Sequence, residues 1–587
     1  MNAAKINQSM HLPCTRAELQ QRGVHRPDII LVSGDAHIDS PYCGVAVVGR
    51  VLEDAGFIVA VLPQPDTQSS QDICSLGEPR LFWGISAGCV DSEVANYTAL
   101  GKPRRTCDFT PGGKNIKRPD RACIVYSNLI RRYFKNTVPL VLGGLEASLR
   151  RIAHYDFRSN RIRRSLLLDA KADLLVYGMG EKSVLEIARR LNTGYSLQAV
   201  PGTCEVSKQR PESYFELPAL EQVQEDSKSY ARMFRQFYQR AVQEFGPGLV
   251  QRHQDRYLVH HPPASLMSRS ELDYIHELFL GHDAHPVCKS QGRIKALETI
   301  QDSIITHRGC YGECSFCSIA LHQGRKIISR SRESILREAR RLVARPGFKG
   351  TLQDVGGPTA NMYGSGCKRL ARGEPCLDRA CIGYQGVCKQ LKPGHKAGIR
   401  LLRELQALPG VHKVIVASGL RHDLVLADKR YGLDYLRQLA GKHVSGQLKI
   451  APEHSVDHIL QLMNKPPAGQ TAEFARIWNR MAGSGPQKKL FLSCYVIAAH
   501  PGCSEQDMRH FLDFARSRLH FIPQQVQIFT PLPCTRSTVM YHSGLDPFSG
   551  REVRSEKSQK GKEQQKNILL VGAGRKRSAG KAEVNKE

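Results

Sequence analysis

The sequence lacks any long hydrophobic run, and its first residues lack the pattern of a secretory signal. No stretch of about eighteen apolar residues occurs in the chain, so no membrane-spanning helix is expected. The opening segment has no apolar core behind a charged stretch, so we expect a cytoplasmic location and no membrane partner. The length of 587 residues exceeds what one compact core supports, so more than one domain is expected.

Acidic residues are few relative to basic ones. The chain has 55 Asp and Glu residues against 84 Lys and Arg residues, which gives a formal net charge of +29. Such a surplus attracts polyanions, so nucleic acid is one candidate partner. A basic, solvated surface without a dedicated partner explains the same composition equally well.

Disulfide bonds are not expected either, although the chain has 18 cysteines. Without a secretory signal, these residues are predicted to be thiols or metal ligands. Isolated cysteines in apolar stretches, such as Cys89 and Cys123, are predicted to be small buried hydrophobic residues.

Residues 1–200 alternate short apolar runs with helix-like segments. Helices are expected over 44–56 and 181–191, between strands over 27–34, 57–63, 81–88, 138–144 and 172–180. This alternation predicts an α/β fold with a doubly wound parallel sheet. Glycines at the ends of these strands fall where such sheets bind ligands.

The rest of the chain divides into further regions. Residues 201–290 are predicted to be a helical connector. Strand and helix then alternate through 291–547, which predicts a partial parallel (β/α)6 barrel, although periodicity alone does not separate a barrel from an open sheet. A Cys-rich insertion covers 364–396. Residues 548–587 are polar and rich in lysine, and we predict a basic disordered tail.

The most informative motif is C-x3-C-x2-C, formed by Cys310, Cys314 and Cys317 directly after an expected strand. Thiolate sulfur is the soft ligand that iron–sulfur clusters require. Three thiolates from one short loop can bind three irons of a cubane and leave the fourth iron open. Gly309 and Gly312 are expected to let the loop wrap closely. A zinc site would more usually offer four ligands in paired C-x2-C form.

With Phe316 before Cys317, the motif resembles the signature of the radical S-adenosylmethionine (SAM) superfamily. The resemblance implies a [4Fe–4S] cluster whose open iron is chelated by SAM. It also implies reductive cleavage of SAM to a 5′-deoxyadenosyl radical and an electron donor such as flavodoxin or ferredoxin.

Longer segments resemble one branch of this superfamily, the YgiQ-type proteins. The segments are SGDAHIDSP (33–41), YIHELFLGHDAHPV (274–287), HRGCYGECSFCSIALHQGR (307–325) and APEHS (451–455). The resemblance covers nearly the whole chain up to about residue 550 and implies a cobalamin-binding-like domain before the barrel. It leaves the substrate open.

Other residues of the barrel are candidate binding groups. Radical SAM enzymes commonly carry a Gly-Gly-Glu stretch at the second barrel strand, whose backbone meets SAM. Here Gly356 and Gly357 are present but Pro358 replaces the Glu, so we expect the two glycines as SAM contacts on a partial match. Later strand ends carry further candidates for SAM's ribose or the substrate, namely Ser418, Glu453, His454 and His500.

The insertion contains four cysteines in a short segment with little apolar content. Cys367, Cys376, Cys381 and Cys388 are candidates for a second metal centre, either zinc or an auxiliary iron–sulfur cluster. Their spacing matches no common zinc finger, and four free thiols explain the sequence equally well.

The N-terminal segment carries part of a cobalamin motif. Domains that ligate cobalt through histidine use D-x-H-x-x-G, and here Asp35 and His37 are followed by Ser40 in place of the glycine. The sequence therefore allows cobalamin without favouring it, and His37 is expected to be an ordinary loop histidine.

The leading hypothesis is a radical SAM enzyme that acts on an unknown substrate. One alternative is a cobalamin-dependent methyltransferase or an RNA methylthiotransferase. Another is a non-enzymatic iron–sulfur scaffold for nucleic-acid binding or redox chemistry. Reductive cleavage of SAM separates the enzyme from the scaffold.

Overall fold

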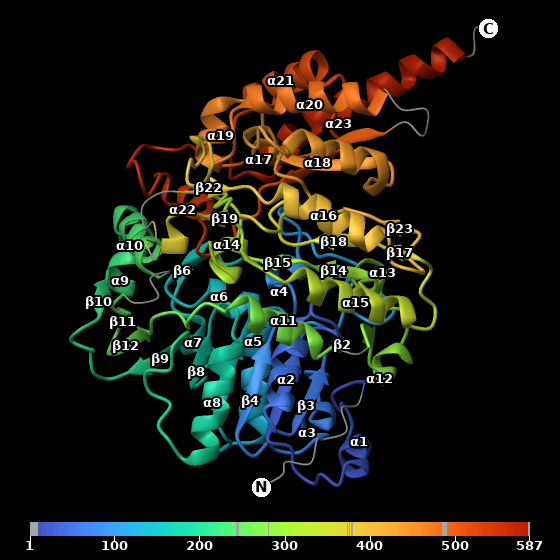
Figure 1. Cartoon of the computed structure of the whole chain (residues 1–587). Helices are drawn as coiled ribbons and strands as arrows, with labels where there is room; N and C mark the ends of the chain where they lie inside the picture. Colours follow the sequence, from blue (N-terminus) through green and yellow to red (C-terminus); the bar gives the residue numbers. More distant parts are fainter. Residues whose placement is uncertain are drawn as a thin grey trace. The chain divides into compact units, whose positions relative to one another are not determined.

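The computed structural model describes residues 10–241, 246–279, 281–372, 374, 376, 380–483 and 490–584, with side chains left out for 483 and 572–584. The chain forms two compact units (Figure 1). The first comprises Met1–Asp302 with Leu321–Gly324, and the second comprises Ser303–Ala320 with Arg325–Glu587.

The first unit is built on a nine-stranded sheet in the order β10-β11-β12-β9-β8-β5-β4-β1-β3. Its parallel part consists of β1 (Ile29–Ser33), β3 (Val59–Pro63), β4 (Phe82–Ser86), β5 (Leu140–Gly143) and β8 (Leu174–Val176). The chain adds β3 on one side of β1 and β4 on the other, so the strand order reverses between β1 and β4. This is the predicted doubly wound sheet, and ligands bind such sheets at the reversal point.

Helices cover the sheet because each presents an apolar face to it. The helices α2 (Gly44–Asp54) and α8 (Glu181–Thr193) contact each other on one face. Their buried residues Leu52 and Ile187 share a hydrophobic cluster with Leu31 of β1. The helix α5 (Ala122–Tyr133) packs against β4. The bounds of α2 and α8 agree closely with the helices predicted over 44–56 and 181–191.

The predicted helical connector at 201–290 is wrong in part. The region contains β9 (Thr203–Ser207), β10 (Phe215–Leu217), β11 (Leu249–His253) and β12 (Arg256–His260), which extend the sheet largely in antiparallel fashion. The predicted long helix is present as α10 (Ser227–Arg240). Short strands of mixed polarity beside a long amphipathic helix give a weak periodic signal, which explains the error. The first unit therefore runs to Asp302 rather than ending near residue 200.

The second unit contains the predicted partial barrel. Its parallel strands, in chain order, are β14 (Ser303–Ile305), β17 (Thr351–Leu352) with β18 (Asp354–Gly356), β23 (Lys413–Val414), β24 (Gln447–Glu453), β25 (Phe491–Ala498) and β26 (Gln525–Ile528). The pairs β14–β18, β17–β23, β24–β25 and β25–β26 are all parallel, and Leu420 bridges to Ile450 of β24.

Helices separate these strands as in a β/α repeat. They include α15 (Arg332–Ala344), α16 (His395–Gln406), α18 (Gly432–Gln438), α20 (Ala468–Gly483) and α21 (Glu505–Phe514). One hydrophobic cluster joins strand residues such as Leu352 and Ile450 to helix residues such as Leu405 and Phe474.

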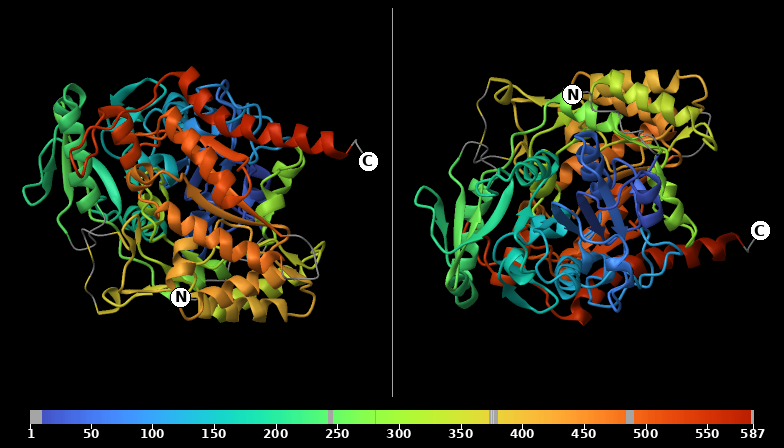
Figure 2. Two further views of the ribbon diagram at one scale, coloured as in Figure 1. Left: turned by 90° about the horizontal axis from the view of Figure 1, so that it is seen from above. Right: turned by 90° about the horizontal axis from the view of Figure 1, so that it is seen from below.

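The predicted disordered tail at 548–587 contains a helix, α23 (Gln559–Val584), drawn in red in Figures 1 and 2. The helix contacts α21, and Leu569 is fully buried in the cluster of the barrel. The side chain of Gln565 accepts a hydrogen bond from the backbone N–H of Ala499 at 2.9 Å and donates to the carbonyl of Cys503 at 3.1 Å. The polar, lysine-rich composition did not predict this helix, because a short apolar segment and one buried amide are enough to dock it on the barrel.

No helix in the part of the chain that the structure describes combines the length and the apolar character needed to cross a membrane.

Candidate functional site

The three motif cysteines lie on one loop between β15 (His307–Arg308) and α14 (Ile319–Gln323). Gly309 adopts a φ of 85°, as predicted for a tight turn. Gly312 is needed for a different reason, because an added Cβ would lie 3.3 Å from the Cys310 sulfur and 3.1 Å from Arg421 Nη1.

The thiols of this loop are close enough to affect one another. Burial, followed by the charge of Cys314, raises the pKa of both the Cys310 and Cys317 thiols, and that of Cys317 reaches about 12. The backbone N–H of Gly312 points at the Cys310 sulfur at 3.3 Å, and that of Ile319 at the Cys317 sulfur at 3.5 Å. Such donors stabilise thiolates that bind a metal. Three thiols on one loop, two of them with backbone donors, suit an iron–sulfur cluster.

A buried arginine lies beside the loop and was missed by the sequence analysis. Arg421 Nη1 points at the Cys314 sulfur at 3.5 Å, and its Nε donates to Asp423 at 2.9 Å. Burial alone would lower the pKa of the guanidinium, but the charges of Asp423 and Cys314 outweigh it and raise that pKa. Asn361 holds the backbone of Arg421 with two hydrogen bonds, of 2.9 and 3.0 Å. The signal in the sequence was the charged run SGLRHD (418–423) after a barrel strand.

The predicted glycine pair lies against the cysteine loop. Gly356 ends β18, and an added Cβ on Gly357 would lie 2.6 Å from the ring of His307. Two residues further on, the Thr359 hydroxyl lies 3.6 Å from the Cys310 sulfur. His307 is fully buried under Gly357, and burial lowers its pKa to about 4. This histidine therefore packs beneath the glycine pair.

Three of the four predicted strand-end groups have structural partners. Ser418 donates its hydroxyl hydrogen bond to Asp354. His454 accepts a hydrogen bond from the N–H of Val456 at 3.1 Å, and His500 contacts the hydroxyl of Ser537 at 2.7 Å. Both histidines are fully buried. Ser418, His454 and His500 are therefore each hydrogen-bonded within the second unit.

Glu453 differs from these groups. Burial raises the pKa of its carboxyl, and the charges of Lys465 and Arg421 offset this only in part. The Lys465 Nζ lies 3.9 Å from the carboxylate, and its charge also acts on Cys317.

Glu453 has a φ of 68° at the end of β24, a backbone conformation that is strained for a non-glycine residue. Ala499 and Cys534, which follow β25 and β26, are also left-handed. Strain of this kind gathers at functional sites.

The insertion contains two small antiparallel strand pairs, of which the second is a hairpin. They are β19 (Gly366–Cys367) with β22 (Leu391–Lys392), and β20 (Ile382–Gly383) with β21 (Gly386–Val387). Burial raises the pKa of the Cys381 thiol to about 12, and the charges of Cys367, Cys388 and Cys376 add to this shift. Among the described residues, no three His, Cys, Asp or Glu side chains converge closely enough to hold a single metal ion as they stand.

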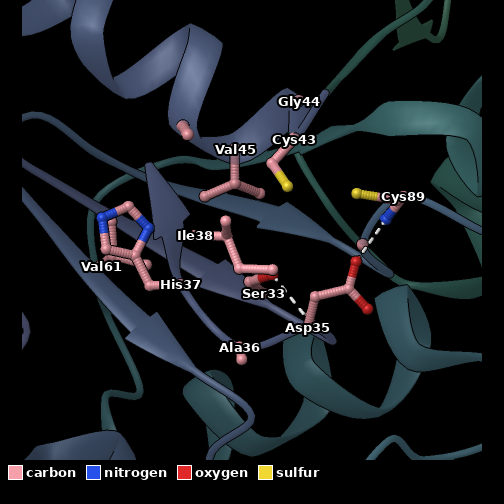
Figure 3. A pocket seen from close by; sticks show the side chains of 12 residues that line it. Ser33, Asp35, Ala36, His37, Ile38, Cys43, Gly44, Val45, Val61 and Cys89 are labelled. Atoms are coloured by element: carbon pink, nitrogen blue, oxygen red, sulfur yellow. Dashed lines mark hydrogen bonds between the residues drawn. The ribbon is translucent and has the colours of Figure 1, made fainter. Parts of the chain in front are cut away.

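The first unit has a small recess at the ends of β1 and β4, with a cavity volume of about 10 Å³ (Figure 3). Asp35 is paired there with Arg118 and accepts a hydrogen bond from the N–H of Cys89 at 2.6 Å. His37 is 2% exposed, and its ring lies 5.9 Å from that of His285. The Nε2 atom of this imidazole is buried without a hydrogen-bond partner, and His37 is one of the residues that line the recess.

Comparison with known proteins gives two family matches that together span most of the chain. Residues 11–303 match the family model described as radical SAM N-terminal, and residues 304–515 match the model of the radical SAM superfamily. A UPF0313 protein of Fusobacterium nucleatum is 44% identical over 559 residues, which cover 95% of this chain and 98% of that protein. A UPF0313 protein of Thermotoga maritima is 46% identical over 574 residues, which cover 97% and 100% of the two chains.

Solved structures are more distant. A radical SAM methyltransferase, TsrM of Kitasatospora setae, with cobalamin and a [4Fe–4S] cluster bound, is 15% identical with a TM-score of 0.48, and the match covers 87% of this chain and 77% of that one. The cobalamin-dependent SAM radical enzyme OxsB is 13% identical with a TM-score of 0.47, covering 85% and 53%. Likeness at this level carries no argument about chemistry.

Proposed function

The chain belongs to the radical SAM superfamily, and on this premise we propose that it binds a [4Fe–4S] cluster and cleaves SAM reductively to start radical chemistry on a substrate. The observation that carries the proposal is the meeting of two loops. Cys310, Cys314 and Cys317 lie close together, and the loop that follows Gly356 and Gly357 places Thr359 beside Cys310.

The cysteine loop provides the ligands in this proposal. The thiolates of Cys310, Cys314 and Cys317 would hold three irons of the cluster, and the fourth iron would be open to SAM. When bound, the cluster supplies the electron that cleaves SAM. Binding displaces the thiol protons, which explains why thiols that resist ionisation in the free chain can still serve as ligands.

The residues around the loop position the cofactors. Gly356 and Gly357 provide a backbone edge without side chains for the amino group of SAM. Arg421 lies beside the thiolate of Cys314 and partly balances the negative charge of the ligand set. Glu453 and Lys465 form a buried carboxyl–ammonium pair near the thiols, which suits a polar group of SAM or of the substrate.

The partners follow from this chemistry. The proposed enzyme needs a one-electron donor such as flavodoxin or ferredoxin, and a substrate whose identity the site does not define. Cobalamin-dependent methyl transfer is the alternative function, and the observation that favours it is the unpartnered Nε2 of His37 in the recess of the first unit. RNA methylthiotransfer and a nucleic-acid partner have no observation in their favour beyond the net charge.

The test is anaerobic reconstitution of the full chain with iron and sulfide, followed by SAM and dithionite. We expect 5′-deoxyadenosine from the wild type and none above background from Cys314→Ser. The control is Cys74→Ser, at the end of α3 (Gln71–Cys74), which is expected to match the wild type. A bound cluster without 5′-deoxyadenosine would favour the non-enzymatic scaffold and overturn the proposal.

A further inference from the structure

Two cysteines of the first unit face each other in the recess at the ends of β1 and β4. Cys43 is the N-cap residue of α2, and Cys89 follows the end of β4. Figure 3 shows their sulfur atoms pointing toward each other, and both residues line the recess. The Cys89 sulfur also lies 3.7 Å from the carbonyl oxygen of Tyr42, the residue before Cys43. Two segments that are distant in the sequence therefore bring their thiols together.

The backbone on both sides of this pair is held in place. The N–H of Cys89 donates to Asp35 at 2.6 Å. Gly88 has a φ of 104°, and a Cβ added to it would meet the Asp35 carboxylate, so the turn before Cys89 packs tightly on Asp35. The N–H of Cys43 donates to the carbonyl of Ser40 at 2.9 Å. The two thiols therefore meet on ordered turns.

The two thiols also influence each other's protons. A hydrogen bond with Cys43 is the main cause that raises the pKa of the Cys89 thiol well above its ordinary value, and burial is the next. Cys89 therefore keeps its proton and can donate it to the sulfur of Cys43. Cys43 lies at the N-terminus of α2, where the aligned peptide dipoles stabilise negative charge. Cys43 is thus suited to provide the nucleophilic sulfur, with Cys89 as its partner.

Access to the pair limits which oxidant can react with it. Cys43 is 6% exposed, and Cys89 is partly exposed. A small oxidant such as hydrogen peroxide suits this narrow recess, whereas a bulky disulfide does not. Two adjacent thiols of this kind form a disulfide when an oxidant removes two electrons.

We propose that Cys43 and Cys89 are a redox-sensitive pair that hydrogen peroxide converts reversibly to a disulfide. The Cys43 thiolate attacks one peroxide oxygen, the O–O bond breaks, and the hydroxide that leaves takes up a proton to become water. The Cys89 sulfur then attacks the sulfenic acid formed on Cys43, the S–S bond forms, and a second water leaves. The two thiols lose two electrons and two protons in total, and one peroxide becomes two waters.

The disulfide changes the recess itself. It joins the first turn of α2 to the loop after β4, at the point where the strand order of the sheet reverses and where such sheets bind ligands. His37 lines the same recess with its unpartnered Nε2. Oxidation therefore links two segments of the lining and replaces two hydrogen-bonding thiols with one bridge. A dithiol such as dithiothreitol reverses the step by thiol–disulfide exchange.

The experiment is a tryptic map of the full chain after reduction, treatment with hydrogen peroxide and alkylation of the remaining thiols. Trypsin is expected to release residues 23–50 and 81–104 as two peptides, with Cys43 and Cys89 as their single cysteines. We expect the two peptides to be joined after peroxide and to separate after dithiothreitol. Two separate peptides at a peroxide dose that oxidises the exposed Cys376 would overturn the proposal, as would Cys43 linked to a different cysteine.

Single variants check that the link needs both residues. Cys43→Ser and Cys89→Ser are each expected to lose the joined peptide. The control is Cys107→Ser, which changes another buried cysteine of the first unit and is expected to keep it. The wild-type map decides the proposal even where a variant fails to fold. The outcome is also independent of SAM cleavage, because neither peptide contains a cysteine of the cluster motif.

Discussion

Arg421 shows how one buried charge contributes to the loop of residues 310–317. Its guanidinium lies between the carboxylate of Asp423 and the sulfur of Cys314. The side chains of Arg421 and Asp423 are 8% and 0% exposed, so each depends on the other to offset the loss of hydration. Cys314 gains a positive neighbour from this pair.

The first prediction removes this pair in two steps. Arg421→Met leaves Asp423 buried without its partner and is expected to cost about 3–5 kcal/mol in the free energy of unfolding. The double variant with Asp423→Leu removes both charges and is expected to recover most of that loss. Urea unfolding of the metal-loaded chain measures both, with Arg430→Met, an exposed arginine, as the control. Equal losses in the single and double variants would contradict this account.

The second prediction concerns pH. Burial lowers the pKa of His454 and His500 from the ordinary 6.5 to about 3. The unfolded chain therefore takes up protons below pH 6.5 that the folded chain does not, so the stability from these histidines is complete above pH 6.5 and is lost as pH falls toward 3. His500→Gln is expected to flatten the dependence of the free energy of unfolding on pH between 6.5 and 3.

Urea unfolding at a series of pH values measures this slope. The control is His510→Gln, which changes an exposed histidine of α21 and is expected to leave the slope as in the wild type. A His500→Gln slope equal to that of the wild type would be inconsistent with a buried neutral imidazole.

At the scale of elements, α23 contributes to the barrel core although its sequence is polar and basic. The third prediction compares two neighbouring leucines of this helix. Leu569 is fully buried, so Leu569→Ala is expected to cost about 2–5 kcal/mol. Leu570 is 36% exposed, and Leu570→Ala is expected to cost about 0.5 kcal/mol or less. Denaturant midpoints of both variants check this. Equal small effects would mean that the helix does not dock.

The fourth prediction concerns the contact between the hairpin of the insertion and Asn464. Gly383→Ala would force a Cβ to within 2.0 Å of the Asn464 oxygen and is expected to cost about 1–3 kcal/mol. Gly366→Ala is the matched control, because a Cβ there meets nothing within 4 Å. Limited trypsin digestion reports the effect, since the insertion contains Lys368 and Lys389. We expect faster cleavage of the insertion in Gly383→Ala alone.

At the scale of the whole molecule, the charge of +29 favours encounters with polyanions. The fifth prediction is that binding to RNA or DNA, where it occurs, is non-specific. The affinity is expected to fall at least tenfold between about 50 and 200 mM salt. Gel shifts with one oligonucleotide and its scrambled version test this. Binding that resists salt and prefers one sequence would instead indicate a dedicated nucleic-acid site.

The sequence by itself determined the fold class, and it predicts the three cysteines of the cluster motif. Strand and helix periodicity depends on neighbouring residues, so the sequence predicted the alternation of strands and helices in both units, although periodicity alone did not separate a partial barrel from an open sheet. The spacing of Cys310, Cys314 and Cys317 is equally local, because one short loop carries all three.

Only the tertiary structure decided which residues surround these cysteines. Arg421 lies 107 positions after Cys314 and contacts its sulfur because strand register brings the two together. His454 and His500 are fully buried, which their place at strand ends did not reveal. The same holds for β9–β12 and for α23, whose weak local patterns become ordered only through the surfaces on which they pack. Long-range contacts of this kind depend on which distant segments pack together, and local periodicity carries no information about that.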